Sequence, residues 1–354
     1  MNMTSSSYER LFFPALKRLD PESAHDHTLT ALALAQSNPA GRATLKAIAG
    51  TVPGRPVQVG GLHFSNPIGI AAGFDKDARV VAGLALLGFG HIEVGTLTPR
   101  PQPGNPRPRV FRLPTDGALI NRMGFPNGGV EAAATRLRAL PIERDYLVGV
   151  SLGKQKETPL EEAAGDYVAV MRAAHAYADY LAVNISSPNT PGLRRLQGGR
   201  YLYELLRTLV AENNHLASTT GRAPKPLWVK IAPDLELSEL DEILDTLLMT
   251  GIDGIIIANT TLWRDGLTKK AGSETGGLSG RPVRQRSTEL IAHVHRRTGG
   301  SLPIIGVGGV DSAATAREKL DAGAAVVQLY TGLIYGGPGI AGRIIRELAA
   351  DASS

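Results

Sequence analysis

Cysteine is absent from all 354 residues of the chain. Its absence excludes disulfides, thiolate metal sites, cysteine-ligated iron–sulfur clusters and any cysteine nucleophile or base. The sequence also lacks a run of about 18 uncharged apolar residues, which is the length that a membrane-spanning helix needs. Its first residues do not have the apolar stretch and small-residue cleavage site of a secretory signal peptide. We therefore expect neither a bilayer span nor a leader.

Neither positive nor negative charge is in large excess. The net charge is +5, with 43% hydrophobic and 20% charged residues, which suits a soluble globular protein of one large or two ordinary domains. The basic excess could favour anionic lipids or acidic ligands. A scattered surface excess is the expected interpretation, and we expect no nucleic-acid partner.

Residues 1–52 are predicted to form a helical segment ahead of a main domain at 53–354. Apolar residues between Tyr8 and Leu19, among them Leu11 and Phe12, recur at helical spacing with basic residues between them. Asp20-Pro21 then marks a break and restart. A second helix follows as far as Asn38-Pro39. Two short amphipathic helices suit the membrane interface and packing against the main domain equally well, so both interpretations stay open.

Short apolar strands alternate with helical patterns throughout the main domain. After a hairpin at 57–64, eight strands and eight helices alternate, which predicts an α/β fold, the (β/α)8 TIM barrel, with the hairpin able to plug one end. An open doubly wound sheet is the alternative, but it seldom needs so many units. The expected strands are 68–71, 91–96, 147–152, 181–185, 227–231, 254–259, 303–307 and 325–330, and the expected helices are 78–87, 129–139, 162–177, 200–213, 238–249, 284–298, 312–321 and 338–350.

The fourth of these strands ends in a polar stretch. Leu181, Val183 and Ile185 alternate with smaller or polar residues, and prolines and a glycine then stop the strand before position 193. Asn184, Ser186, Ser187 and Asn189 lie between the apolar run and these breakers. Barrel enzymes place their chemistry at this end of the strands. A polar loop that only turns the chain is the simpler interpretation of this stretch in isolation.

The other strand ends narrow the chemistry. Histidine is missing from them and carboxylates are few, which argues against a metal site and against a glycosidase with paired carboxylates. Glycine-rich turns at 306–309 and 331–332 follow the last two strands, where barrels usually bind a phosphate through backbone N–H groups.

Two lysines and several amides complete this predicted mouth. Lys76 and Lys230 could each form a Schiff base, stabilise an electron-rich ring such as a reduced flavin, or simply pair with surface carboxylates. Asparagine offers both a donor and an acceptor, which matches the edge of a pyrimidine-like ring. Four asparagines follow this pattern: Asn121, Asn184, Asn189 and Asn259.

Eight motifs, in order along residues 8 to about 345, give the chain a family resemblance. They are Ala72-Gly-Phe-Asp-Lys-Asp77, Gly104-Asn-Pro-Arg-Pro-Arg-Val-Phe-Arg-Leu113, Asn121-Arg-Met-Gly-Phe125, Asn184-Ile-Ser-Ser-Pro-Asn-Thr-Pro-Gly-Leu-Arg194, Val229-Lys-Ile-Ala-Pro-Asp234, Ala258-Asn-Thr-Thr261, Gly276-Gly-Leu-Ser-Gly-Arg-Pro282 and Ile305-Gly-Val-Gly-Gly309. Each alone is weak evidence. Together they resemble the dihydroorotate dehydrogenase family, and most closely its membrane-associated, quinone-dependent class 2.

The resemblance implies an enzyme that uses FMN to oxidise (S)-dihydroorotate to orotate in pyrimidine (UMP) synthesis and passes the electrons to a quinone. By position, Ser187 resembles the base that removes the C5 proton while hydride leaves C6 for flavin N5. The implied substrate residues are Lys76, Asn121, Arg122, Met123, Gly124, Phe125, Asn184, Asn189, Asn259 and Thr260. The implied cofactor residues are Ala72, Gly73, Phe74, Asp75, Lys76, Thr96, Ser151, Asn184, Lys230, Ala258, Gly280, Gly309, Tyr330 and Thr331.

The absent cysteine bears on the class. Soluble class 1 members use a cysteine base, and one subtype needs a partner subunit with an iron–sulfur cluster, which we do not expect here. The N-terminal helices are then the implied quinone entrance and peripheral membrane attachment, on the cytoplasmic side of the cell membrane if the protein is bacterial. His25, Arg112 and Tyr330 match residues of that quinone site, although His25 alone would equally suit a capping or packing role.

Two positions depart from the family pattern, and one chemical step is unexplained. Ser151 stands where many class 2 members have an FMN-contacting asparagine, and Ala78 stands where glycine is common. The alanine should matter little if its backbone dihedrals are ordinary. A serine hydroxyl is a poor base without help, so we hypothesise a water- or backbone-assisted relay involving Thr190 or a nearby group. The loop through Gly199 is predicted to act as a lid.

Two other functions are compatible with parts of the pattern. A phosphate-binding isomerase or lyase would use Lys76 or Lys230 covalently and would be colourless. A membrane-bound nucleotide sensor would bind orotate or FMN without turnover.

Overall fold

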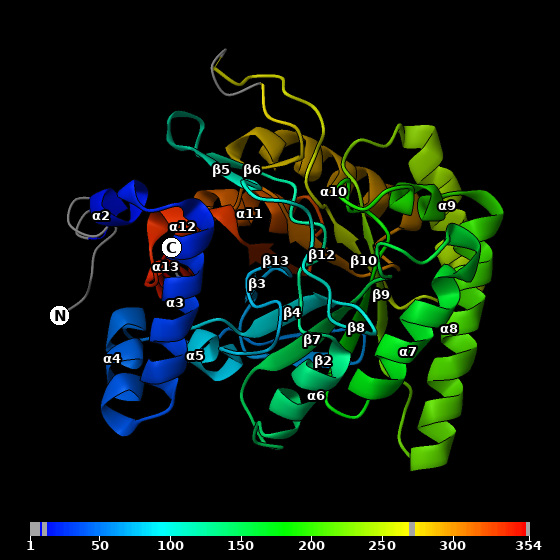
Figure 1. The fold of residues 1–354 in the computed structure, drawn as a ribbon, viewed down its shortest axis with the longest axis horizontal. Coiled ribbons are helices and arrows are strands. Elements are labelled where there is room, and N and C mark those ends of the chain that lie inside the picture. Colours follow the sequence, from blue (N-terminus) through cyan, green and yellow to red (C-terminus); the bar gives the residue numbers. More distant parts are fainter. Residues whose placement is uncertain (1–7, 9–12, 269–272, 352–354) are drawn as a thin grey trace.

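Eight parallel strands close into a barrel at the centre of the molecule (Figure 1). The computed structural model describes residues 8, 13–268 and 273–351. Around the barrel the strand order is β10-β12-β13-β3-β4-β7-β8-β9, and every neighbouring pair is parallel. The strands are β3 (Ile68–Ile70), β4 (His91–Leu97), β7 (Leu147–Leu152), β8 (Tyr180–Asn184), β9 (Leu227–Ile231), β10 (Gly254–Ile257), β12 (Ile304–Val307) and β13 (Val326–Leu329). The predicted (β/α)8 barrel is confirmed.

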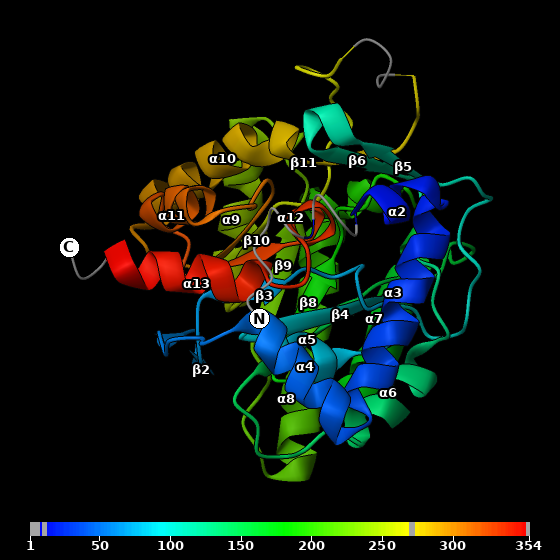
Figure 2. The same ribbon diagram turned by 90° about the vertical axis from the view of Figure 1, so that its left-hand side faces the viewer.

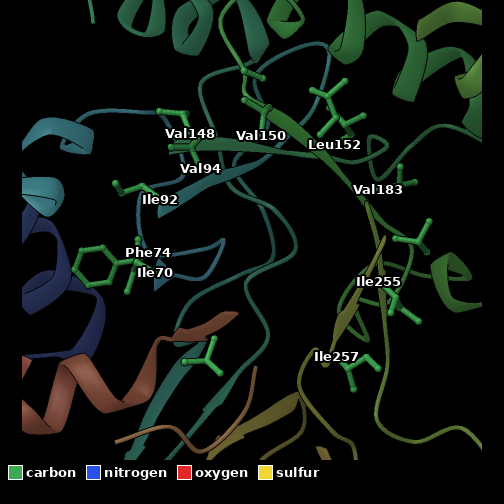
Figure 3. Close-up of a cluster of buried hydrophobic side chains, with 14 of the residues drawn as sticks. Ile70, Phe74, Ile92, Val94, Val148, Val150, Leu152, Val183, Ile255 and Ile257 are labelled. Carbon is green, nitrogen blue, oxygen red and sulfur yellow. The ribbon is translucent and has the colours of Figure 1, made fainter. Parts of the chain in front are cut away.

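Alternation along the strands builds two apolar layers. One set of side chains faces outward and packs under the surrounding helices, and Ile92, Val94, Val150 and Ile257 belong to it (Figure 3). The other set fills the barrel interior. The hairpin of β1 (Val57–Val59) and β2 (Leu62–Phe64) joins that interior layer, so it plugs one end of the barrel as predicted. Because both faces are covered, the strands read as continuous apolar runs.

Helices surround the barrel in the expected order. They are α5 (Val81–Leu86), α6 (Val130–Arg138), α7 (Ala163–Ala174), α8 (Gly199–Thr220), α9 (Leu237–Thr250), α10 (Arg284–Thr298), α11 (Ala313–Asp321), α12 (Thr331–Gly336) and α13 (Ile340–Asp351). The first one starts three residues later than the predicted 78–87. The Asp75 carboxylate accepts the backbone N–H groups of Arg79 and Val80 at 2.8 and 2.7 Å, and Ala78 has a φ of +55°. This turn occupies the residues that the pattern assigned to a helix.

The N-terminal segment packs on the barrel. Among the described residues it forms three helices, α2 (Phe13–Arg18), α3 (Pro21–Gln36) and α4 (Pro39–Ala49), rather than two. Asn38 caps α4 ahead of a proline, a start signal that the sequence reading took only as an end. Leu11 and Phe12 of the first predicted helix lie outside the described residues. Figure 2 shows α3 and α4 alongside α5, and Leu29, Leu32 and Leu45 share the core under the barrel helices.

A small antiparallel sheet was not predicted. The excursion after β4 folds into β5 (Val110–Leu113) and β6 (Ala118–Asn121), and β11 (Gly277–Gly280) pairs with β6 from far along the chain. Its strands have only four residues each, too few for an alternating pattern to stand out. This sheet places Asn121 at the edge of the barrel mouth. Over the described part of the chain, no helix has the length and apolarity needed to cross a membrane.

Candidate active site

A cavity lies at the carboxyl ends of the barrel strands. It encloses about 1180 Å³ of space between its atoms, part of it open to solvent. The predicted residues that line it are Lys76, Asn121, Met123, Gly124, Phe125, Asn184, Ser187, Asn189, Asn259 and Thr260 of the substrate set, and Ala72, Gly73, Thr96, Lys230, Ala258, Gly280, Gly309, Tyr330 and Thr331 of the cofactor set.

The asparagines form two hydrogen-bonded groups on the cavity wall. Asn189 Nδ2 donates to Asn121 Oδ1 at 3.2 Å, which joins the β8 loop to the end of β6. On the other side, Asn259 Nδ2 donates to Ser186 Oγ at 2.9 Å, and Asn184 Nδ2 donates to Thr96 Oγ1 at 2.8 Å. Each amide is held by a neighbour, so its orientation is set before a ligand arrives. A ligand that failed to match these donors and acceptors would leave buried amides unpaired.

Ser187 lies in the same wall and is nearly fully buried. Its Oγ accepts the backbone N–H of Asn189 at 3.3 Å. Within the described residues, that N–H is the one hydrogen-bond partner of the hydroxyl. Thr190 is buried nearby without a bond to it. The hydroxyl proton is therefore free to point elsewhere. The Thr190 relay stays a prediction.

The two lysines have different surroundings. Lys76 Nζ donates to Gly73 O at 2.6 Å, and burial lowers the pKa of Lys76 to about 8. Lys230 Nζ lies 3.1 Å from Glu93 Oε1, and this carboxylate is fully buried inside the barrel. Gln328 Nε2 also donates to Glu93, at 2.9 Å. Lys230 is therefore a paired cation in the cavity floor.

Glycines pack closely against neighbouring backbone and side chains at the ends of β12 and β13, beside the cavity. A Cβ on Gly309 would come within 2.5 Å of Arg284 Cβ, and one on Gly332 would come within 2.2 Å of Val310 O. A Cβ on Gly280, across the cavity, would meet Gly117 O at 2.3 Å. The hydroxyls of Ser279 and Thr331, which lie 2.9 Å apart, stand beside these glycines, so small neutral groups border this end of the cavity. That set suits a phosphate group, so the residues present fit a phosphorylated flavin.

Four predicted residues have side chains that do not line this cavity. Arg122 turns outward to Glu274 and stacks over the Phe111 ring. The Asp75 carboxylate is occupied by the α5 turn described above. Ser151 lies behind the wall, 2.9 Å from Thr96 Oγ1, so it supports Thr96 from the second layer.

The fourth, Phe74, lines a second cavity between the N-terminal helices and the barrel. This cavity encloses about 1420 Å³ and is mostly apolar. His25, Arg112 and Tyr330, the predicted quinone residues, come together in its wall. The His25 ring packs edge-on to Phe74 with centroids 5.1 Å apart, and burial lowers the pKa of His25 to about 3. The two cavities share wall residues: Lys76, Val110, Leu119, Met123 and Tyr330.

The fold and the site define a (β/α)8-barrel enzyme. The family model described as dihydroorotate dehydrogenase matches residues 56–351. The chain therefore belongs to the dihydroorotate dehydrogenase family.

Curated relatives and solved structures agree. The chain is 50% identical over 341 residues to "Dihydroorotate dehydrogenase (quinone)" of Acidithiobacillus ferrooxidans, covering 96% of this chain and 93% of that one. It is 49% identical over 351 residues to the protein of that name in Salinispora arenicola, covering 98% of each. The structure of DHODH from Eimeria tenella in complex with ferulenol superposes with a TM-score of 0.86 at 37% identity, covering 94% and 92% of the chains. The expected family and its oxidoreductase class are confirmed.

Sequence reasoning missed several residues that hold the site together. Glu93 was hidden in an apolar strand, although a lone carboxylate there was a signal. Asn105 lay inside a quoted motif but had no assigned role, and its amide reaches Asn189 O at 3.0 Å. Ser279 belongs to the unpredicted sheet, so no strand end pointed to it.

Proposed function

We propose that the chain oxidises (S)-dihydroorotate to orotate with FMN as its cofactor and a membrane quinone as electron acceptor, in pyrimidine synthesis. The observation that carries this proposal is the position of Ser187 beside two groups of preset amides, in a cavity that is lined by glycines at its other end. The names of the curated relatives support the substrate and the acceptor.

The cofactor would occupy the half of the cavity formed by β9 to β13. Gly280, Gly309 and Thr331 would hold its phosphate, and Thr96, Lys230 and Ala258 would border its ring. The bound flavin supplies the atom, N5, that accepts hydride from substrate C6. Lys230 would favour negative charge on the ring, and the Glu93 carboxylate pairs with this lysine on its buried side at 3.1 Å.

The substrate would lie against the amides. Asn121, Asn189 and Asn259 would bind the pyrimidine edge and carboxylate. The buried Thr260 hydroxyl, which has no hydrogen-bond partner within the described part of the chain, offers a further contact. Ser187 Oγ would accept the proton from C5. For this the serine must give up its own hydroxyl proton to a neighbouring group, and the Asn189 N–H that reaches Oγ would stabilise the oxygen in its deprotonated form.

The second cavity would admit the quinone. Its apolar wall suits a prenylated ring, and Lys76 and Tyr330 border both cavities, so the two ligands would be close enough for electron transfer. The N-terminal helices would attach peripherally to the membrane, on its cytoplasmic side if the organism is bacterial. Exposed Leu19 and Leu34 together with Lys17 and Arg18 support that attachment. No iron–sulfur partner subunit is expected.

A visible spectrum of the purified protein tests the proposal. The protein should be yellow, and anaerobic dihydroorotate should bleach the flavin band, which a quinone then restores. A colourless protein would favour Schiff-base chemistry at Lys76 or Lys230. A yellow protein that does not bleach would favour a ligand sensor. Either outcome contradicts the proposed oxidation.

A further inference from the structure

A buried ion pair ties the N-terminal helix α3 to the substrate side of the barrel mouth. Arg109 Nη2 lies 2.6 Å from Glu22 Oε1, and Arg109 Nε lies 3.1 Å from both carboxylate oxygens. The side chains are only 7% and 9% exposed. Burial alone would raise the pKa of Glu22, but hydrogen bonds and charge from Arg109 and Arg107 lower it overall. The pair is thus charged, and removing one partner would leave a buried charge.

Arg109 uses its remaining nitrogen to hold a turn. Nη1 donates to Pro103 O at 2.6 Å and to Asn105 O at 2.8 Å. Gly104 between them has a φ of +77°, and a Cβ there would meet Met123 O at 2.4 Å. Only glycine fits this close approach, so the turn has one position relative to the arginine.

Asn105 at the end of this turn bridges the two segments that carry the substrate amides. Its Nδ2 donates to Asn189 O at 3.0 Å and to Arg122 O at 3.1 Å, and its backbone N–H donates to Met123 O at 2.9 Å. One segment provides Asn121, and the other provides Ser187 and Asn189. Asn105 therefore sets the spacing of the two groups that meet at the bond between Asn121 and Asn189.

We propose that Glu22, Arg109 and Asn105 are positioning residues for the substrate, so that helix α3 helps to order the dihydroorotate site as well as the wall of the second cavity. The inference rests on the proposed function, since it concerns where that substrate binds. Glu22 itself lines the second cavity. A change at α3 is transmitted through four residues to the loop of Ser187. The N-terminal segment would then order the substrate site in addition to admitting the quinone.

Flavin-loaded variants test this with two readouts: the spectroscopic dissociation constant for orotate, and the anaerobic rate of flavin reduction by dihydroorotate. Arg109→Gln and Asn105→Ala should each raise the orotate dissociation constant roughly tenfold or more, as expected for losing a hydrogen bond that orders a charged or polar network. Because the two residues act in series, the double variant should be little worse than either single one.

Arg107→Gln is the matched control. Arg107 contacts the same carboxylate at 3.0 Å, but its side chain is 63% exposed and has no bond to the turn. Its orotate dissociation constant should change less than twofold. A purely structural role would lower the melting temperature of Arg109→Gln without moving the orotate dissociation constant or the reduction rate. That result would overturn the proposal.

Two further comparisons separate misfolding of a variant and failure of the proposed function from failure of this proposal. If Arg109→Gln does not fold, Asn105→Ala decides alone, because it removes no buried charge. An unchanged orotate dissociation constant in folded Asn105→Ala overturns the proposal. Failure of the unaltered protein to bleach with dihydroorotate would instead count against the proposed function, so the two failures are distinguishable.

Discussion

The ammonium of Lys230 and the carboxylate of Glu93 lie 3.1 Å apart, one facing the cavity and the other inside the barrel. Glu93 is wholly buried and also accepts hydrogen bonds from Gln328 and Tyr180. The positive charge of Lys230, next to the proposed flavin, is therefore neutralised by the Glu93 carboxylate inside the barrel. Breaking such a pair from one side leaves an uncompensated buried charge.

Glu93→Gln should consequently lower the free energy of unfolding by about 3–5 kcal/mol. It should also shift the flavin midpoint potential to more positive values, since Lys230 would act on the ring without its counter-charge. Urea unfolding and a spectroelectrochemical titration measure the two effects. Glu204→Gln, in the exposed pair with Arg200, is the control and should change neither. An unaltered potential in Glu93→Gln would contradict the coupling.

Ser187→Ala should slow flavin reduction by about 10²–10⁴-fold, the range for losing a general base. Orotate binding should be largely preserved, because the amides remain. Anaerobic stopped-flow absorbance checks the rate. Ser186→Ala is the comparison variant. Ser186 Oγ accepts a hydrogen bond from Asn259 Nδ2 at 2.9 Å, so losing this hydroxyl should weaken orotate binding more than it slows flavin reduction. Near-normal reduction in Ser187→Ala would refute the base assignment.

Ala78→Gly should stabilise the protein. The alanine has a φ of +55°, which contradicts the condition of ordinary dihedrals under which this position would matter little. A left-handed alanine costs about 1–2 kcal/mol, and glycine gives back part of that through its greater entropy in the unfolded chain. We expect a net gain of about 0.5–1 kcal/mol by chemical denaturation. Ala211→Gly, on the exposed face of α8, should lose about 1 kcal/mol. Equal signs for the two variants would disprove the argument.

Acid should destabilise the protein partly through His91. Burial lowers the pKa of His91 from 6.5 to about 3, and its ring nitrogens have no hydrogen-bond partner among the residues that the structure describes. Between these pKa values the unfolded chain binds a proton that the folded state does not. The free energy of unfolding therefore falls as pH drops from 6.5 towards 3. His91→Leu should remove about 1.4 kcal/mol per pH unit from this slope around pH 5. Urea unfolding at several pH values measures the slope, and an unchanged slope in His91→Leu would contradict this role.

The Leu19→Ser, Leu34→Ser double variant should weaken attachment to lipid vesicles. Both leucines are exposed, at 42% and 69%, on the N-terminal segment. Vesicle flotation should show reduced binding, and turnover with a long-chain quinone should fall while flavin reduction by dihydroorotate stays the same. Ile142→Ser, 95% exposed on a loop after α6, is the matched control. Equal vesicle binding by both variants would contradict attachment through these helices.

The barrel was predictable because its signal is local. Apolar strands buried on both faces, each followed by a helical pattern, stand out in the sequence, and motifs at their ends identified the family. The sheet of β5, β6 and β11 was not predictable, because its strands are short, and one joins the others across about 150 residues of chain. The third N-terminal helix was missed because Asn38-Pro39 ends one helix and starts the next.

By itself the sequence determined the barrel, the absence of cysteine chemistry, and most of the residues that line the main cavity. The tertiary structure decided which side chains of each motif face that cavity. Within Gly73 to Lys76, Phe74 lines the second cavity, Asp75 holds a turn, and Lys76 borders both cavities. It also decided the long-range pairs, Glu93 with Lys230 and Glu22 with Arg109. Such pairs depend on distances between strands and helices that are far apart in the chain, and no local pattern encodes them.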